Sequence, residues 1–332
     1  MLGFVLGITA VDPIRYGLPF ERFVNPDKET LADFDIEFCD QRRDEVANYI
    51  QSKYGVDRVA QISSDDARPL PSRLVICDRP LSELVPLYSN PESGFPAAKI
   101  NLSQITSAGL VQFNVINQKA LTINQRTVEE ARRSGVAIDL DQIPLDDSEA
   151  YRLLSKGETS TVAVHDDERY KATLLAVQPD CFEDLCAVIA LSQSRLQNFI
   201  PQYVEHKRHP DLVRYFHPAL ESITADTHGL ILYQEQLMHI VHKIAGFSFA
   251  QGDLFRRALK KSNREAIAVH KIRFINGAKS FGLSSAESTG LFEHLVFSCQ
   301  WIFNKSHAVA FAMIDYQTAW LQANYNYGDA EK

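Results

Sequence analysis

The spacing of apolar residues changes near residues 116 to 120, and this change limits the possible fold more than any other feature of the sequence. Before it, short apolar runs such as SRLVIC (72–77) and GLVQFNVI (109–116) predict strands. From about Lys119 onward, apolar residues recur every three or four positions, as in the series that ends at Gly246, and predict helices. We therefore predict an α+β chain with a boundary near residues 116 to 120.

Three further segments have clear local patterns. DQRRDEVANYIQSKYG predicts a helix with a possible cap at Asp40 and a stop at Gly55. The polar, proline-containing stretch SSDDARPLPS (63–72) is typical of a loop. AVAFAMIDYQTAWLQA (308–323) is apolar almost all round and predicts a buried helix.

The first 13 residues, MLGFVLGITAVDP, are apolar but too short to cross a membrane. No basic segment precedes them, and Asp12 and Pro13 end the run well before the ~20 residues that a span needs. They predict a buried strand rather than a signal peptide. The 5 cysteines form no matched CxxC pairs, which favours reduced thiols in the cytoplasm over a disulfide framework or a zinc site.

The net charge of −8 does not indicate nucleic-acid binding, but one segment is basic. Residues 251–275 hold seven basic residues against two acids, a balance of +5, so the remainder carries −13. The basic residues are Arg256, Arg257, Lys260, Lys261, Arg264, Lys271 and Arg273. Such a stripe indicates an anionic partner, and the alternative is a solvated helix face.

The stretch LADFDIEFC (31–39) places three acids on alternate positions of a predicted strand. Asp33, Asp35 and Glu37 would project from one face about 7 Å apart, given the ~3.3 Å rise per residue. Carboxylates gathered in a partly buried site repel unless cations lie between them, and carboxylate oxygens suit Mg²⁺. Two interpretations remain open: a two-metal site, or the exposed face of an edge strand.

The same strand belongs to a segment that resembles the palm domain of the alpha subunit of bacterial DNA polymerase III, the C-family replicative polymerase. There the acidic strand reads PDFDxDF. Further similar motifs follow in the same order along nearly the whole chain: DRPLSELVPLY (78–88), AGLVQF (108–113), IPLDD (143–147), QPDCFEDL (178–185), GLILYQEQLM (229–238), FRRALKK (255–261) and FNKSHAVAFAMIDYQTAWL (303–321).

The resemblance implies a reduced palm, with a mixed sheet and helices, followed by a mostly helical fingers domain. The palm would comprise residues 1–62 and 72–116, and part of the fingers would occupy 117–332. Residues 63–71 would form a joint where the family has a triphosphate-binding segment and the thumb. DNA and deoxynucleoside triphosphates are the implied ligands, with other replisome subunits as possible partners and no membrane.

For the acidic strand, the resemblance implies that Asp33 and Asp35 are catalytic metal ligands for two Mg²⁺ ions, with Glu37 in place of a neighbouring acid. The third catalytic aspartate of the family follows AGLVKF, but this chain has Asn114 there and Gln112 in place of the lysine. Replacing a carboxylate by an amide removes a full negative charge, so Mg²⁺ binding should be weaker.

For the helical region, the resemblance implies contacts with nucleotide and DNA. Arg256 and Arg257 match a basic pair that faces the phosphates of the incoming nucleotide, and guanidinium groups bind phosphate in bidentate fashion. Lys260 and Lys261 would supply charge. The signature FNKSHA contributes three further candidates: Asn304, Lys305 and His307. His307 is equally compatible with a packed, hydrogen-bonded histidine.

Three functions follow as hypotheses. The first is a catalytically impaired or inactive relative of the polymerase that retains DNA binding, because Asn114 and the shortened joint both weaken the site. The second is a residual DNA-directed DNA polymerase that uses two-metal nucleotidyl transfer. The third is a non-enzymatic module that binds a replisome partner or nucleic acid. A decaying gene copy without a role is a further alternative.

Overall fold

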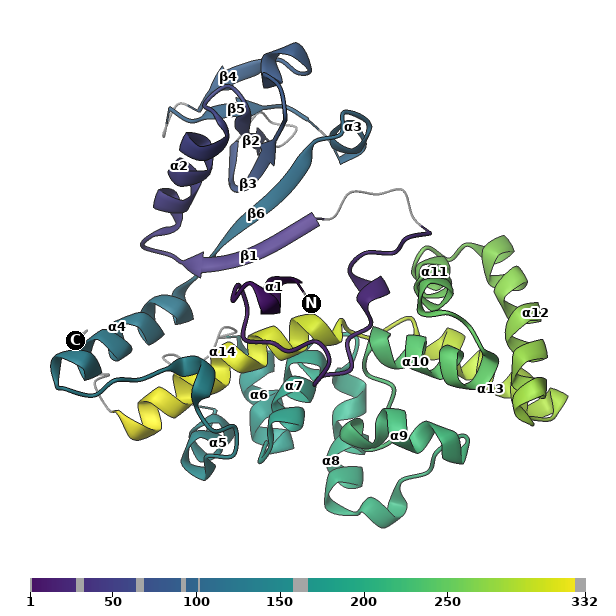
Figure 1. Cartoon of the computed structure of the whole chain (residues 1–332). Coiled ribbons are helices and arrows are strands. Elements are labelled where there is room, and N and C mark those ends of the chain that lie inside the picture. Colours follow the sequence, from purple (N-terminus) through teal and green to yellow (C-terminus); the bar gives the residue numbers. More distant parts are fainter. Residues whose placement is uncertain are drawn as a thin grey trace. The chain divides into compact units, whose positions relative to one another are not determined.

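The computed structural model describes residues 2–27, 33–63, 69–90, 94–100, 102–157 and 167–325. The chain forms two compact units. One, the sheet unit, comprises Lys28–Arg126, and the other, the helical unit, comprises Met1–Asp27 together with Thr127–Lys332 (Figure 1). Among the described residues, no helix combines the length and apolar character needed to cross a membrane.

The sheet unit contains a six-stranded mixed sheet. Its strands are β1 (Asp33–Cys39), β2 (Val59–Ser63), β3 (Pro69–Ile76), β4 (Leu87–Ser89), β5 (Pro96–Ala98) and β6 (Val111–Gln118), in the order β1-β6-β3-β2-β5-β4. The pairs β1/β6 and β2/β5 are parallel, and the other neighbours are antiparallel. This sheet, followed by a mostly helical region, confirms the predicted α+β class.

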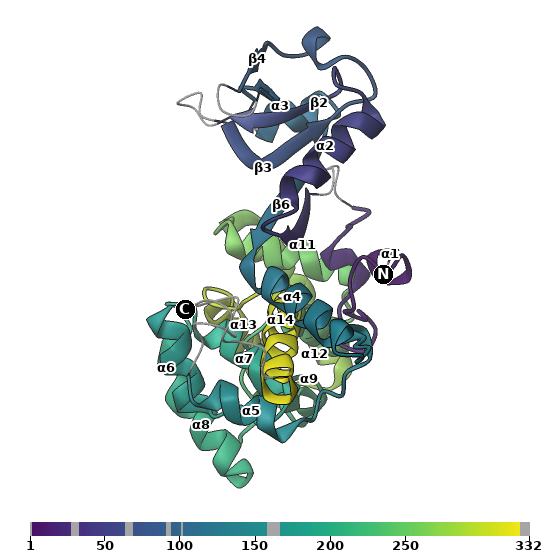
Figure 2. The same ribbon diagram turned by 90° about the vertical axis from the view of Figure 1, so that its left-hand side faces the viewer.

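Side chains alternate between the two faces of each strand, so the sheet unit has two small apolar clusters. Helix α2 (Arg43–Tyr54) covers one face, where Ala47 packs with Val59, Leu74 and Val115 (Figure 2). On the other face Val75 and Ala60 belong to a cluster with residues near α3 (Leu102–Ser107) and the 3₁₀ turn Leu81–Glu83. The helix predicted between Asp40 and Gly55 is present as α2, but its cap residue is Arg42 rather than Asp40.

The helical unit contains the remaining helices and two apolar cores. The α-helices are α1 (Leu2–Val5), α4 (Lys119–Arg133), which begins in the sheet unit, α5 (Ser148–Ser155), α6 (Glu168–Val177), α7 (Phe182–Leu191), α8 (Ile200–Arg208), α9 (Glu221–Thr224), α10 (Gln234–Ala245), α11 (Phe249–Lys260), α12 (Arg264–Phe281), α13 (Ser285–Ser298) and α14 (Lys305–Asn324). Short 3₁₀ turns lie at Phe20–Arg22, Leu140–Gln142, Gln197–Phe199, Pro210–Leu212, Pro218–Leu220 and Ala225–Thr227.

The predicted buried helix near the C-terminal end is confirmed. Helix α14 packs beside α5 and α7 in the first core (Figure 1). Asp315, one of its polar residues, is buried and accepts a 2.6 Å hydrogen bond from the Tyr170 hydroxyl. Helices α10 to α13 surround the second core. Helix α10 ends at Gly246, as predicted, in a left-handed conformation with φ of 66° that glycine adopts without strain.

The prediction for the first residues is wrong. They form the four-residue helix α1 and a turn, not a buried strand, and Val5, Leu6 and Ile8 are more than half exposed. Gly7 has a φ of 68°, and the Ile8 amide donates to the Gly3 carbonyl, so the chain turns back on itself. An apolar run becomes a strand only where a neighbouring strand pairs with it, and none of the described strands does.

The compact units have limits different from those of the predicted domains. Residues 1–27 cluster with the helices because Val11, Tyr16 and Leu18 belong to the first helical core. Of the predicted joint, residues 64–68 lie outside the described residues, and Pro69–Ser72, expected in a loop, form the start of β3. The assignment of the parts to palm and fingers domains stays a prediction.

Candidate functional site

The candidate catalytic strand β1 lies at one edge of the described sheet, beside β6. In the parallel register Asp33 is opposite Gln112 and Asp35 is opposite Asn114, and Asn114 is in turn opposite Arg73 of β3. Residues opposite one another on neighbouring strands project to the same face. The structure therefore brings Asp35 and Asn114 together. For Asp33 the backbone is described and the side chain is not.

A chain of side-chain hydrogen bonds links the amides to the carboxylate. The Gln112 Nε2 donates to the Asn114 Oδ1 at 3.1 Å, and the Asn114 Nδ2 donates to the Asp35 Oδ1. Asp35 is exposed and Asn114 is partly exposed. The amide thus directs its N–H groups at the carboxylate, and its oxygen already accepts a hydrogen bond from Gln112.

Glu37, the third acid of the strand, has a different neighbour. It lies opposite Ile116, and the Gln118 Nε2 donates to its carboxylate at 3.4 Å. Burial raises the pKa of Glu37 above its ordinary value; the hydrogen bond from Gln118 opposes that rise and the charge of Asp35 adds to it. A half-buried acid with a raised pKa is a weaker cation ligand than an ionised, exposed one.

The described side chains supply only part of the Mg²⁺ site that the resemblance implies, because the side chain of Asp33 is not described. Mg²⁺ requires oxygen ligands in near-octahedral geometry, whereas the group that faces the Asp35 carboxylate is an N–H donor of Asn114. A hydrogen bond from a neutral amide satisfies the carboxylate without any cation. Asp35 remains one anionic oxygen donor, and we derive no catalytic step through a metal.

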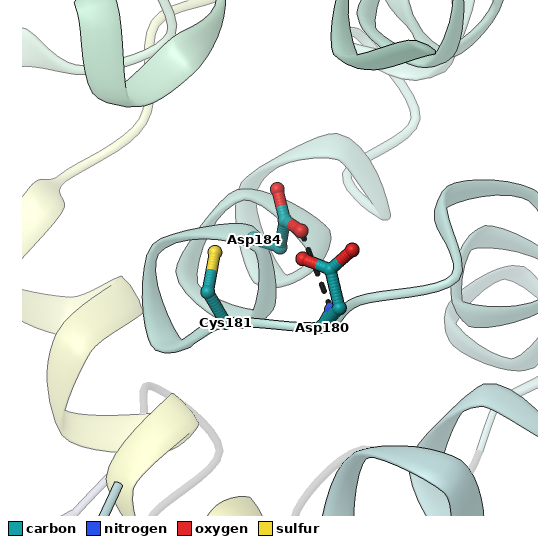
Figure 3. Close-up of side chains that lie close together, drawn as sticks. All are labelled: Asp180, Cys181 and Asp184. Atoms are coloured by element: carbon teal, nitrogen blue, oxygen red, sulfur yellow. Dashed lines mark hydrogen bonds between the residues drawn. The ribbon is translucent and has the colours of Figure 1, made fainter. Parts of the chain in front are cut away.

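A second group of potential metal ligands lies in the helical unit. Among the described residues, Asp180, Cys181 and Asp184, at the start of α7, are the one set of three such side chains that converge (Figure 3). Asp184 is 2% exposed, and its Oδ2 accepts a hydrogen bond from the Asp180 amide at 3.4 Å. Exposed Asp180 and half-buried Cys181 complete the set.

This second group is a salt-bridge network rather than a metal site. The Lys207 ammonium lies 2.5 Å from Asp184 and 3.2 Å from Asp180, so a cation is already present. Burial alone would raise the pKa of Asp184, but the His228 ring nitrogen 3.5 Å away and the hydrogen bonds from Lys207 and Tyr203 hold it well below its ordinary value. Burial, reinforced by the charge of Asp184, raises the pKa of the Cys181 thiol to about 12, so the thiol remains protonated and a poor metal ligand.

The predicted basic pair lies on α11 around a buried acid. Asp253 precedes Arg256 and Arg257 by three and four residues, and this spacing places all three side chains on one face of the helix. Arg256 is 4% exposed, and Asp253 is fully buried. Both arginines donate to Asp253. Lys260 and Lys261, at the end of the helix, are exposed.

The FNKSHA signature begins α14, and its residues are largely engaged with the fold. The Asn304 Oδ1 caps the helix by accepting from the Ser306 amide at 3.1 Å, and the Lys305 amide donates to buried Glu235 at 2.8 Å. The ammonium of Lys305 lies 5.9 Å from the centre of the Tyr233 ring. His307 is exposed, with its ring edge-on to the Phe311 ring.

The two most distinctive motifs also pair directly with each other. The Phe303 amide donates to the Leu232 carbonyl and the Gln234 amide donates to the Phe303 carbonyl, so LYQEQ and FNKSHA form a short parallel bridge. Gln236 accepts hydrogen bonds from the Leu232 and Tyr233 amides. Much of this signature therefore stabilises the fold.

Sequence reasoning did not identify three participants in this region: Asn25, Glu235 and Asp253. Asn25 donates to Asp253 at 3.1 Å from more than 200 positions away, and no local pattern predicts that contact. The spacing of Asp253 before the two arginines was a usable signal, because oppositely charged residues three and four apart meet on a helix.

Comparisons with known proteins agree with the motifs. The model of the bacterial DNA polymerase III alpha subunit finger domain matches residues 120–282, and that of the bacterial DNA polymerase III alpha NTPase domain matches residues 1–66. The DNA polymerase III subunit alpha of Caulobacter vibrioides is 34% identical, and the alignment covers 98% of this chain and 35% of that protein.

Two further relatives carry the same name. The DNA polymerase III subunit alpha of Halalkalibacterium halodurans is 31% identical and that of Thermus aquaticus is 30% identical; both alignments cover 98% of this chain, and 36% and 33% of the respective relatives. The chain thus spans about a third of the length of the curated relatives that it matches. From the two domain models and these relatives, we conclude that the chain belongs to the family of the bacterial DNA polymerase III alpha subunit.

Proposed function

We propose that this chain is a catalytically impaired or inactive member of the family that retains DNA binding. One observation carries the proposal: at the position of the third catalytic aspartate, Asn114 donates a hydrogen bond to Asp35. Two carboxylates at this place would repel each other and favour a cation between them, whereas a carboxylate and an amide attract each other without one. We therefore expect this pair to bind weakly the Mg²⁺ that nucleotidyl transfer would need.

The length of the alignments supports this proposal. The match to the Caulobacter relative extends over 399 positions, although 98% of the 332-residue chain supplies only about 325 residues, so at least about 70 positions lie opposite gaps in this chain. Gaps of this kind are compatible with the loss of the triphosphate-binding segment and the thumb that the resemblance implies at residues 63–71. Without these elements, primer and nucleotide lose their positioning, which contributes much of the rate in enzymes.

The basic end of α11 supports retained DNA binding. Arg257 is partly exposed and Lys260 and Lys261 are exposed, and cations of this kind bind phosphates without regard to sequence. DNA, deoxynucleoside triphosphates and other replisome subunits are the proposed partners. We place the protein in the cytoplasm, and its five free cysteines are compatible with a reducing compartment.

The direct test is primer extension on a primed template with Mg²⁺ or Mn²⁺, with Asp33→Ala and Asp35→Ala as controls. We expect no extension by the unmodified chain. Template-dependent synthesis that either control abolishes would overturn the proposal and establish the second hypothesis, a residual DNA-directed DNA polymerase.

A salt titration of DNA binding distinguishes the non-enzymatic alternative. Contact through several Lys and Arg residues makes the logarithm of affinity fall steeply with the logarithm of salt concentration, by about 0.9 per phosphate contact. A flat response, or no binding in low salt, would contradict retained DNA binding and favour a protein partner.

A further inference from the structure

A cavity in the helical unit, which we call the aromatic cavity, is large enough for a small molecule. Its volume is about 300 Å³, at the lower end of the range for ligand sites in proteins. Its wall comes from the start of α8 and the turn before it, from residues between 214 and 231, and from the C-terminal part of α13 with Trp301 after it. The cavity shares no residue with the acidic strand or with the basic end of α11.

Aromatic rings form much of this wall, and two of them are largely exposed. Phe216 is 47% exposed and Phe297 is 55% exposed. The Phe216 ring lies nearly parallel to the His294 ring, at 20° with 5.9 Å between the ring centres. The Phe297 ring is edge-on to Trp301 at 5.2 Å. Exposed rings in a concave wall favour a planar apolar ligand, because such a ligand removes their surface from water.

Two glycines let the part of the wall that carries Arg214 and Phe216 approach its neighbours. A Cβ at Gly229, where φ is 84°, would lie 2.7 Å from the Val213 side chain. A Cβ at Gly290, on α13, would lie 3.2 Å from the Phe216 ring. The positions of Arg214 and Phe216 are therefore constrained by close packing of this segment.

Arg214 gives the cavity a positive charge. Its Nη1 donates to the carbonyls of Asp211 at 2.6 Å and Val213 at 3.0 Å. Within the part of the chain that the structure describes, no carboxylate pairs with this guanidinium group, and none of the residues that line the cavity is acidic. The two hydrogen bonds to its own loop orient the group, and its other nitrogens can bind a carboxylate.

Trp301 adds an unpaired donor to the wall. Its indole Nε1 is buried and has no hydrogen-bond partner among the described residues. A buried donor without a partner is costly, and an acceptor oxygen of a ligand would remove that cost. The charge of Arg214 and the donor of Trp301 thus both favour a ligand with an anionic oxygen.

We propose that the aromatic cavity binds a small planar aromatic carboxylate, whose ring lies against Phe216 and Phe297 and whose carboxylate pairs with Arg214. This inference goes beyond the proposed function and does not depend on it, because it involves neither DNA nor the acidic strand.

The first test is isothermal titration calorimetry of the full chain with 1-naphthoate, 1-naphthamide and cyclohexanecarboxylate. The amide keeps the rings without the charge, and cyclohexanecarboxylate keeps the charge without an aromatic plane. We expect 1-naphthoate to bind with a dissociation constant on the order of 0.1 mM, and the other two compounds to bind about tenfold more weakly or less. No binding of 1-naphthoate at several millimolar, or equal binding of the three compounds, would overturn the inference.

Arg214→Gln tests the partner of the carboxylate, with Arg208→Gln as the matched control for the loss of one charge. Arg208 is exposed at the end of α8 and does not line the cavity. Both variants should melt near the temperature of the unmodified chain, because both side chains are exposed. We expect Arg214→Gln to weaken 1-naphthoate binding about tenfold without changing 1-naphthamide binding, and Arg208→Gln to change neither. Unchanged 1-naphthoate binding by Arg214→Gln would contradict the inference.

Nuclear magnetic resonance locates the ligand without any change at Arg214. The chain contains 2 tryptophans, Trp301 and Trp320, so the isotope-labelled chain should give one indole Nε1–H signal for each, and Trp320→Phe assigns them. We expect 1-naphthoate to shift the Trp301 signal and to leave the Trp320 signal in place, because Trp320 does not line the cavity. A shift of Trp320 alone, or of neither signal, would show that the ligand does not occupy this cavity.

Discussion

Asp35 of the sheet unit differs from Asp184 and Asp253 of the helical unit in burial and in the charge of its partner. Asp35 is exposed, and its partner is the neutral amide of Asn114. Asp184 and Asp253 are buried, and each has a cationic partner at 2.5 to 2.7 Å. A buried carboxylate must be paired for the fold to form, whereas an exposed one need not be.

This difference explains which motif residues the fold itself requires. Removing one partner from a buried ion pair costs about 3–5 kcal/mol, whereas an exposed pair contributes only about 0–1 kcal/mol. The motifs that contain Asp184 and Glu235, and Arg256 and Arg257 of FRRALKK through Asp253, therefore contribute to stability whether or not the chain is catalytic. The acidic strand has no such constraint, so we expect an amide at position 114 to have little effect on folding.

The largest effect is expected for Asp184→Asn. The substitution leaves the Lys207 ammonium with exposed Asp180 as its carboxylate partner, beside the Gln178 carbonyl, and weakens the 2.7 Å hydrogen bond from the Tyr203 hydroxyl. We expect the free energy of unfolding to fall by about 3–5 kcal/mol in urea titrations. Asp180→Asn is the matched control, and it should cost less than about 1 kcal/mol because that side chain is 75% exposed. Equal losses for the two variants would contradict the difference that we infer between buried and exposed carboxylates.

Acid should destabilise the chain through the buried carboxylates of Asp184 and Asp253. The pKa of Asp253 is lowered: burial alone would raise it, but hydrogen bonds from Arg257 and Asn25 and the charge of Arg256 outweigh burial, and the pKa of Asp184 is lowered as well. A carboxyl group with a pKa lower in the folded than in the unfolded state stabilises the fold above the unfolded value of 3.8. That stability is lost as the pH falls below 3.8 towards the folded value. We expect unfolding titrations between pH 7 and 2.5 to show this loss, and Asp184→Asn to show a shallower one. A pH-independent result would contradict the account.

A smaller effect is expected for Asn114→Asp, which restores a carboxylate opposite Asp35. Without divalent ions, we expect a loss of about 1 kcal/mol or less, because the repulsion is partly exposed to solvent. With Mg²⁺ at tenfold its dissociation constant, binding should restore about 1.4 kcal/mol. The control is Asn117→Asp, the same substitution on the same strand but on the opposite face, which should not respond to Mg²⁺. A similar Mg²⁺ response from both variants would indicate non-specific screening.

The smallest effect is expected for Glu37→Gln. Burial raises the pKa of Glu37, so its charged form is destabilised in the fold, and the cost appears as the pH rises above the ordinary value of 4.5. Removing the charge should stabilise the chain at pH 7 by a few tenths of a kcal/mol, on the order of other surface substitutions. The difference should vanish near pH 3 in matched thermal melts, and a destabilised variant at pH 7 would show that the Gln118 contact outweighs burial.

Local patterns predicted the elements well and their partners poorly. The period of apolar residues predicted β6, α10 and α14, because each of these patterns reflects one buried face. The opposition of Asp35 to Asn114 depends on a parallel pairing across 79 positions, and only the family resemblance suggested it. The charge count of residues 251–275 treated Arg256 as a surface cation, because composition does not report burial.

The central claim is that the Asp35 and Asn114 pair is complete without a divalent cation. It is tested most directly by calorimetric melting of the unmodified full chain as Mg²⁺ is raised to several millimolar, with Asp35→Ala in parallel. We predict that Mg²⁺ shifts the melting temperature of both chains equally, by no more than the screening effect of added salt. A rise in the unmodified chain that Asp35→Ala abolishes would show a functioning metal site and would contradict the account.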